Sequence, residues 1–169
     1  MADIDLYIDH LLKWEGRGFY KIPGDKGGWT CMGVTLNTFR QFYGADKTPE
    51  DLKNMSMKEW KGIFYYGFWG PVKAEQIKNQ SLATLIMDCC WMSGRVTAIK
   101  KIQRCLGLQA DGIVGPKTLR MLNQFSKDSF YKIYQMRKAW FEAIVAKDPT
   151  QKKFLKGWMN RLNSVIYEQ

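Results

Sequence analysis

Apolar side chains recur every three or four residues along most of the chain, which is the spacing of one face of an α-helix. The only strand candidates lie between Trp29 and Thr35, as a small hairpin. The sequence therefore predicts a mainly helical fold with a small β-hairpin or extended excursion near residues 29–35. Helical patterns cover residues 4–15, 35–42, 56–64, 79–94 and 95–106, and three further helices are expected to begin near Pro116, at Ser126 and after Pro149.

Capping signals define several of the helix boundaries. Thr35 is expected to cap a short helix that Gly44 ends, and Ser56 with Glu59 has the form of a capping box. Ser81 is expected to cap the helix of residues 79–94. The aromatic segment of residues 67–71 is expected to form a turn that ends the preceding helix, where its rings either floor a groove or fill the core.

One carboxylate interrupts the apolar stripe of the first helix. Ile4, Ile8 and Leu11 share a face, and Glu15 occupies the next position of that face. Burial disfavours the charged form of a carboxylic acid, which suits a general acid that works near neutral pH. Gly16 then stops the helix beside a glycine-rich loop that is open to ligands. The alternative is a solvated acid, or one paired with the arginine two positions further on.

A second acid, Asp88, is the single charge in the segment of residues 79–94, which is apolar nearly all round and therefore predicts a central helix. A buried carboxylate is costly unless it is hydrogen-bonded. A structural link to a backbone or tryptophan donor is the favoured interpretation, and a catalytic role is the alternative.

Composition limits the other kinds of chemistry. The 169 residues suffice for one packed core, and no apolar run approaches the roughly 20 residues that cross a bilayer. Cys31, Cys89, Cys90 and Cys105 lack paired C-x-x-C spacing, so reduced, buried thiols are expected rather than a zinc site or a disulfide scaffold. The single histidine, His10, lies in the first helix, where a surface or packing role is expected and histidine-rich metal sites are excluded.

The charge balance predicts a polyanionic partner. Lysine and arginine number 26 against 16 acidic residues, which gives a net charge of +10. Nucleic acid, an anionic membrane surface and bacterial wall polymers all fit this charge, and a basic surface without a partner is the alternative.

An ordered set of short motifs extends from about residue 4 to residue 166. The motifs are Glu15-Gly16, Asp25-Lys26-Gly27-Gly28-Trp29-Thr30, Gly33-Val34-Thr35, Phe68-Trp69-Gly70-Pro71-Val72, Asp88 to Gly94, and Asp111 to Leu119. In order and spacing the first five resemble the E-G-G, D-x-G-G-x-T-x-x-G-I-T, Y-W-x-P-I and D-x-x-x-N-x-G patterns of the glycoside hydrolase 108 family, which are phage-type N-acetylmuramidases. The last, together with Gln103-Arg104-Cys105-Leu106-Gly107, resembles the predicted peptidoglycan-binding region of that family, some of whose members are labelled secretion activators.

The resemblance implies a lysozyme-like fold with a catalytic region over residues 1–93 and a helical peptidoglycan-binding region over residues 94–169, packed as one globular unit. It implies a peptidoglycan hydrolase that cuts between N-acetylmuramic acid and N-acetylglucosamine, with bacterial peptidoglycan as its partner and no metal or organic cofactor. A basic wall-binding face is a further expectation, with solvated helix lysines as the alternative. This face would comprise Lys100, Lys101, Arg104 and Lys117.

The resemblance also assigns roles to individual residues. Glu15 is the expected catalytic acid, and Asp25 is the candidate second group, with a turn-capping carboxylate as its alternative. Thr30 is expected to hold the attacking water or a sugar hydroxyl. Candidates for substrate binding are the aromatic Tyr20, Trp29 and Trp69, which are alternatively core residues, and the acidic Asp88 and Asp111.

The sequence departs from the family pattern by extra length at Arg17-Gly18, which leaves open whether Phe19 or Tyr20 takes the aromatic position, and by three substitutions. Cys31 and Met32 replace an asparagine and a tyrosine, and Met92 replaces the asparagine of the central helix. These changes remove polar groups from near the expected cleft, so a non-catalytic peptidoglycan-binding protein of the same fold is an alternative. A basic nucleic-acid-binding protein is a weaker one, because the sequence has no helix-turn-helix, zinc-finger or RNP signature.

The first residues, Met1 to Asp5, are acidic and lack the basic and apolar regions of a Sec-type signal. The protein is therefore expected to be made in the cytoplasm and to reach the periplasmic or extracellular wall through a holin-like partner or on lysis.

Overall fold

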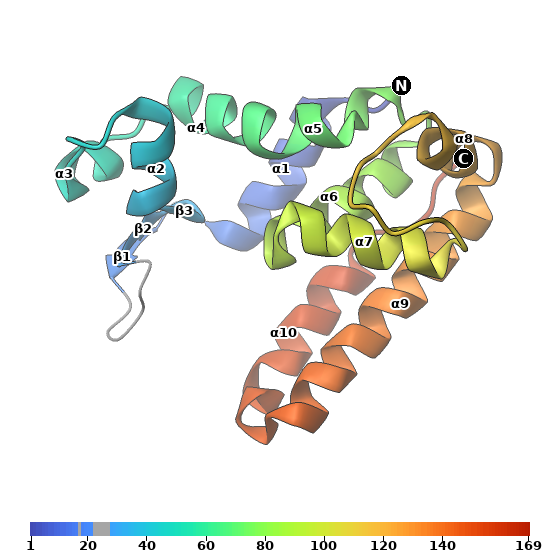
Figure 1. The fold of residues 1–169 in the computed structure, drawn as a ribbon. Helices are drawn as coiled ribbons and strands as arrows, with labels where there is room; N and C mark the ends of the chain where they lie inside the picture. Colours follow the sequence, from blue (N-terminus) through green and yellow to red (C-terminus); the bar gives the residue numbers. More distant parts are fainter. Residues whose placement is uncertain (17, 22–27) are drawn as a thin grey trace. The chain divides into compact units, whose positions relative to one another are not determined.

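The computed structural model describes residues 1–16, 18–21 and 28–169, and these residues form two compact units (Figure 1). One unit comprises residues 8–67, and the other comprises residues 1–7 with residues 68–169. The predicted mainly helical fold with a small hairpin is confirmed. No helix in the described ranges has the length and apolar character needed to cross a membrane.

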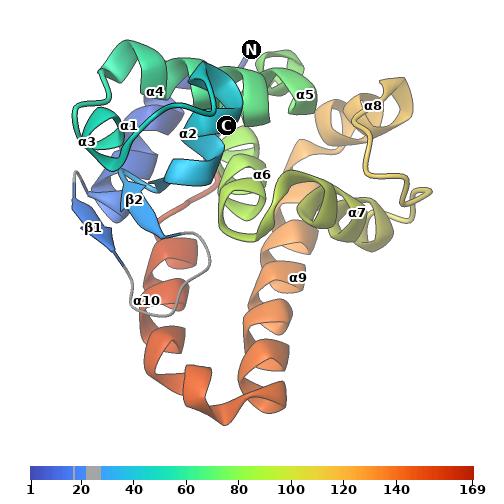
Figure 2. The same cartoon turned by 60° about the vertical axis from the view of Figure 1, so that its left-hand side comes forward.

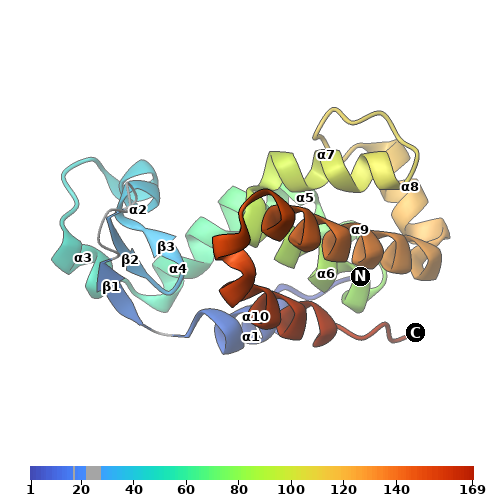
Figure 3. The ribbon, with the colours of Figure 1, turned by 90° about the horizontal axis from the view of Figure 1, so that it is seen from below.

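The unit of residues 8–67 contains most of the first helix, a small sheet and three short helices. Strand β2 is central in the antiparallel sheet, whose order is β1-β2-β3, and helices α2 and α3 pack beside it (Figure 3). The elements are α1 (Ile4–Glu15), β1 (Phe19–Lys21), β2 (Trp29–Cys31), β3 (Val34–Thr35), α2 (Leu36–Tyr43), α3 (Pro49–Lys53) and α4 (Met57–Phe64).

A two-residue turn, Met32-Gly33, joins β2 to β3. Both residues have positive φ, 47° and 77°, as a type I′ hairpin turn requires. The Trp60 indole donates a hydrogen bond of 3.0 Å to the Met32 carbonyl and holds the turn against α4. The hairpin expected near residues 29–35 is therefore present. Strand β1 was not predicted, because its three residues become a strand only by pairing with β2.

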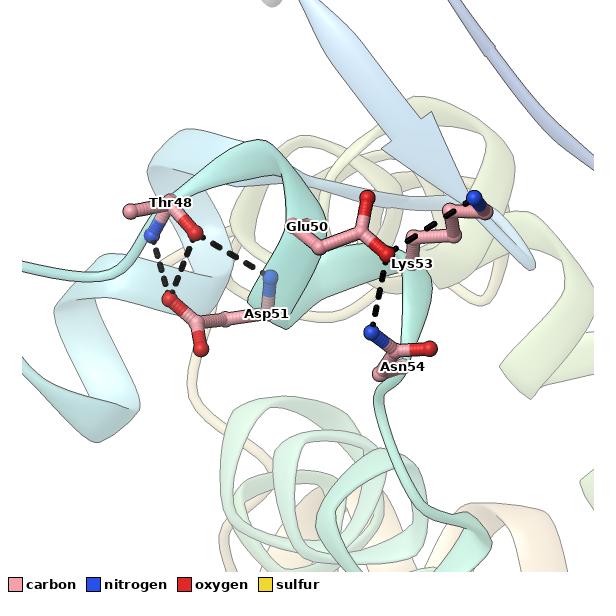
Figure 4. A network of polar contacts seen from close by, with 5 residues as sticks. All are labelled: Thr48, Glu50, Asp51, Lys53 and Asn54. Atoms are coloured by element: carbon pink, nitrogen blue, oxygen red, sulfur yellow. Dashed lines mark hydrogen bonds and ion pairs between the residues drawn. The ribbon is translucent and has the colours of Figure 1, made fainter.

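Side-chain caps begin the short helices of this unit. Thr35 accepts a hydrogen bond from the Thr38 amide, and Ser56 and Glu59 form the predicted capping box. A second capping box at α3 joins Thr48 to Asp51 (Figure 4), where Glu50 also contacts Lys53 and Asn54. The Thr48 hydroxyl and backbone amide hold the pKa of Asp51 below its usual value, so the capping carboxylate stays ionised at neutral pH.

The second unit is built around α6, which packs against α7 and α9, while α9 and α10 lie side by side as an antiparallel pair (Figure 2). A π-helical segment, η1 (Tyr65–Trp69), leads into this unit. Its other elements are α5 (Gly70–Val72), η2 (Ala74–Gln76), α6 (Gln80–Ser93), α7 (Arg95–Cys105), α8 (Pro116–Gln124), α9 (Ser126–Lys147), η3 (Pro149–Gln151) and α10 (Lys152–Asn163).

Two predicted boundaries in this unit are wrong. Asn79, not Ser81, caps α6, and the Ser81 hydroxyl instead accepts a hydrogen bond of 3.0 Å from the Glu168 amide in the C-terminal tail. Residues 67–71 do not form a turn, because α4 continues through η1 into α5. Pro71 lies in the first turn of α5, directly after the π-helical segment. The helical path ends at Lys73, which has a left-handed φ of 52°.

Cysteine side chains contribute to the core as free thiols, as predicted. Cys31, Cys89 and Cys90 are buried, and Cys105 is half-buried. Burial raises the pKa of Cys89 to about 12 and that of Cys105 to about 11, so both remain protonated at neutral pH. These thiols therefore behave as small apolar groups.

A buried ion pair joins α6 to α10. Asp88 is 5% exposed and Arg161 is 8% exposed. The Asp88 Oδ1 atom lies 2.8 Å from Arg161 Nε and 2.7 Å from Nη2. The structural role expected for Asp88 is thus present, but its donor is an arginine 73 positions later rather than a backbone or tryptophan N–H.

Replacing Arg161 with Met should lower the free energy of unfolding by about 3–5 kcal/mol, because it leaves the Asp88 carboxylate buried without its counter-charge. The double variant Asp88→Leu/Arg161→Met should recover most of this loss. Urea denaturation measures both, with the exposed Arg104→Met as the control. Equal stability of the Arg161→Met and Arg104→Met variants would contradict this account of the pair.

Candidate active site

Glu15 is the last residue of α1 and is half-buried. Ile8 and Leu11, which share its helical face, are buried, so the stripe that packs α1 also sets the position of the acid. Gly16 follows with a φ of +65°, and its amide donates a hydrogen bond of 3.1 Å to the Leu12 carbonyl. This left-handed residue ends the helix immediately after Glu15.

The sheet begins directly after this helix end. The Met32 amide donates a hydrogen bond of 3.1 Å to the Gly18 carbonyl, so the β2–β3 turn lies beside the chain as it leaves α1. Strand β1 starts at the next residue, Phe19. In the unit of residues 8–67, the half-buried Glu15 and the edge strand β1 therefore lie within a few residues of each other in the sequence.

The strand register separates the expected substrate-binding residues. Tyr20 pairs with Thr30, and Thr30 pairs with Thr35, so these three side chains share one face of the sheet. Trp29 belongs to the opposite face, where its ring stacks on Phe19 with centroids 4.7 Å apart. Tyr20 and Trp29, both candidates for substrate binding, therefore lie on different faces of the sheet.

Exposure distinguishes the residues of these two faces. Tyr20 is 43% exposed, whereas Thr30 is 6% exposed. Trp29 is half-buried, and the Lys21 ammonium lies 5.8 Å from its ring centroid. The Phe19–Trp29 stack was not predicted, because strand β1, which places Phe19 on the face opposite to Tyr20, was itself not predicted. Tyr20 therefore offers the most open aromatic ring among the expected residues of this unit.

Asp25, the expected second catalytic group, lies outside the described residues, and so does Arg17. The two substitutions in this unit are in buried positions. Cys31 and Met32 are both buried, and burial raises the pKa of the Cys31 thiol. Their side chains thus contribute to the packing of the unit, and Met92 is half-buried on α6 in the other unit.

The remaining predicted residues belong to the unit that contains α6. Trp69 is 2% exposed and packs near Tyr7, so its position favours the core interpretation over sugar stacking. Asp88 is held in the ion pair with Arg161. Asp111 lies in the exposed loop between α7 and α8.

Asp111 is part of a hydrogen-bond network in that loop. Its Oδ1 atom accepts 2.8 Å hydrogen bonds from the Ile113 amide and from Gln103 Nε2. These bonds hold the pKa of Asp111 below its usual value. Gln103 is buried at the centre of this network.

The described residues contain no cluster of three or more His, Cys, Asp or Glu side chains that could hold a metal ion. Near the end of α1 the described residues offer a carboxylic acid at Glu15, an aromatic face at Tyr20 and a hydroxyl group at Thr30. An early helix that ends in a half-buried glutamate, a small antiparallel sheet and a buried apolar helix together define a lysozyme-like fold.

Comparisons with known proteins agree with this class. The family model described as "Glycosyl hydrolase 108" matches residues 8–94, and the one described as "Predicted Peptidoglycan domain" matches residues 97–163. The solved structure "Structure of Brucella abortus SagA" is similar with a TM-score of 0.79 and 26% sequence identity, over 95% of this chain and 90% of that chain. No curated protein matches the chain.

The chain therefore belongs to the glycosyl hydrolase 108 family. The two matched segments support a role in the hydrolysis or binding of peptidoglycan. The boundary between the two compact units lies near residue 67 and so differs from the boundary between the two matched segments. Helix α6 lies within the first matched segment but packs with α7 and α9.

Replacing Gly16 with Ala should lower the free energy of unfolding by about 1–2 kcal/mol, since a side chain disfavours the left-handed conformation that ends α1. Apart from its chain neighbours, no described residue has an atom within 4 Å of the added Cβ, so we attribute the effect to the backbone conformation. Gly157→Ala, in α10, is the matched control and should stabilise by about 0.5–1 kcal/mol. Thermal unfolding of both variants measures the difference, and stabilisation by Gly16→Ala would contradict the assigned helix end.

Proposed function

We propose that the protein is a peptidoglycan hydrolase that cleaves the glycan strand between N-acetylmuramic acid and N-acetylglucosamine, with Glu15 as its general acid. The observation that carries this proposal is the position of Glu15. The apolar face of α1 holds it half-buried, and Gly16 ends the helix directly behind it.

Glycosidic cleavage needs an acid to protonate the leaving oxygen and a second group that activates water or stabilises the cationic sugar centre. A half-buried carboxylic acid at a helix end combines partial shielding from water with access to a ligand. Glu15 supplies the first role in this proposal. We assign the second to Asp25, from its place in the family motif.

The surrounding residues suit a saccharide that is part of a charged polymer. The exposed ring of Tyr20 offers a face for stacking on a sugar, and the neighbouring Thr30 on the same sheet face offers a hydroxyl group. The net charge of +10 attracts the carboxylates of the wall and raises the rate of encounter at low salt. In this proposal the protein acts on the wall after release from the cytoplasm, through a holin-like partner or on lysis.

Replacing Glu15 with Gln should lower the rate of sacculus hydrolysis by at least about 100-fold, because the amide cannot donate the proton that the leaving oxygen requires. Binding to the sacculi should remain, since the change preserves the shape of the side chain. Release of soluble fragments measures the rate, and pelleting with sacculi measures the binding. Glu50→Gln, which changes an exposed acid on α3, is the matched control and should keep full activity.

Unchanged hydrolysis in the Glu15→Gln variant would overturn the role of Glu15. Binding of sacculi by the wild-type protein without any release of fragments would overturn the proposed activity and favour the non-catalytic peptidoglycan-binding alternative. Binding to DNA with indifference to sacculi would favour the nucleic-acid alternative.

A further inference from the structure

A cavity of about 590 Å³ lies at the loop between α7 and α8, within the unit that contains α6. Its wall combines apolar and polar groups and contains no aromatic ring. Leu108, Ile113 and Pro116 supply apolar surface, and Ile113 is 67% exposed. Gln103, Asp111, Lys117 and Thr118 supply the polar groups.

Gln103 fixes the shape of this cavity. Its Nε2 atom donates to Asp111 Oδ1 at 2.8 Å and to the Ile113 carbonyl at 2.9 Å, and its Oε1 atom accepts from the Gly112 amide at 2.8 Å. Gly112 has a φ of +82°, a conformation that L side chains rarely adopt. The loop is thus held in one conformation before any ligand arrives, which lowers the entropic cost of binding.

Three hydrogen-bond donors at the cavity donate to no acceptor among the described residues. Helix α8 begins at Pro116, and its N-cap residue, Gly115, has no side chain to accept a hydrogen bond. The first-turn N–H groups of Lys117 and Thr118 therefore have no acceptor inside the helix. The Thr118 hydroxyl is 5% exposed, and its single hydrogen-bond contact among the described residues is with Gln103 Nε2 at 3.4 Å. Because both Gln103 hydrogens already make shorter bonds, the Thr118 hydroxyl keeps its own proton to donate.

The charges at the cavity favour a carboxylate over other anions. Lys117 is exposed at the start of α8 and makes no ion pair with any described residue. Its ammonium adds to the positive end of the helix dipole. Asp111, ionised on the same wall, disfavours a dianion such as phosphate and favours a ligand that also carries an amino group.

We propose that this cavity binds a carboxylate of the peptide stem of peptidoglycan, with the uncapped start of α8, the Thr118 hydroxyl and the Lys117 ammonium as its donors. The inference rests on the proposed function in taking peptidoglycan as the polymer, and it assigns the peptide rather than the glycan to this cavity. The absence of aromatic rings from the lining supports this choice, since sugar faces stack on such rings. The exposed apolar rim suits the alanine methyl groups of a stem peptide.

Binding of a soluble disaccharide-tetrapeptide to the isotopically labelled full chain tests the proposal by nuclear magnetic resonance. The largest shifts should fall on the backbone amides of Gly112, Lys117 and Thr118. Lys117→Met should weaken the affinity about tenfold, since it removes one charge-assisted hydrogen bond. Arg120→Met, which removes an exposed charge from the same helix outside the cavity lining, should leave the affinity unchanged.

Three further ligands decide what the cavity recognises. The peptide-free disaccharide and the same muropeptide with amidated carboxylates should both fail to shift these amides, and inorganic phosphate should bind more weakly than the muropeptide. Equal shifts from the peptide-free disaccharide, or retained affinity after amidation, would overturn the proposal. Because this experiment measures binding without hydrolysis, inactivity towards sacculi would count against the proposed activity but not against the cavity.

Thr118→Val gives an independent check because it keeps the shape of the side chain and removes only the hydroxyl group. The muropeptide affinity should fall while the unfolding temperature stays close to that of the wild-type protein. An unchanged affinity in both Thr118→Val and Lys117→Met would overturn the assignment of donors.

Discussion

Helix α6 is the element on which the larger unit depends, because it is apolar nearly all round and carries one charge that must be neutralised inside the core. Arg161 supplies that neutralisation from α10, so the last helix of the chain is joined to α6 by two N···O contacts. Both termini also bond near the start of α6, with the Ala2 amide on the Ile77 carbonyl and the Glu168 amide on Ser81. A buried carboxylate thus brings distant segments of the sequence into one core.

In the smaller unit, the acid on an apolar helix face is only partly buried and lies at the end of its helix. Glu15 also interrupts an apolar stripe, but it does so at a helix end, where the chain turns away through Gly16 and leaves the side chain half-buried. This contrast is the reason that we propose different roles for the two acids. Asp88 is enclosed by its arginine and serves the fold, whereas Glu15 keeps the partial access to solvent that proton donation to a substrate requires.

Local signals in the sequence predicted much of this architecture. Helical periodicity, the caps at Thr35 and Ser56 and the hairpin near residues 29–35 are all encoded within a few neighbouring residues. The misses depend on distant partners. Strand β1 exists only through pairing with β2, Ser81 is engaged by the C-terminal tail, and the donor for Asp88 lies 73 positions away. At the site, the stripe predicted the position of Glu15, but only the strand register could separate Tyr20 from Trp29.

We therefore assign glycan chemistry to the unit of Glu15 and peptide recognition to the loop between α7 and α8. The central claim is that the bond cut is the one between N-acetylmuramic acid and N-acetylglucosamine. Borohydride reduction of digested sacculi, followed by mass spectrometry of the fragments, identifies the sugar at each new reducing end. The account predicts reduced N-acetylmuramic acid in the wild-type digest and none above background with Glu15→Gln. Reduced N-acetylglucosamine in its place, or fragments released without any new reducing sugar, would contradict it.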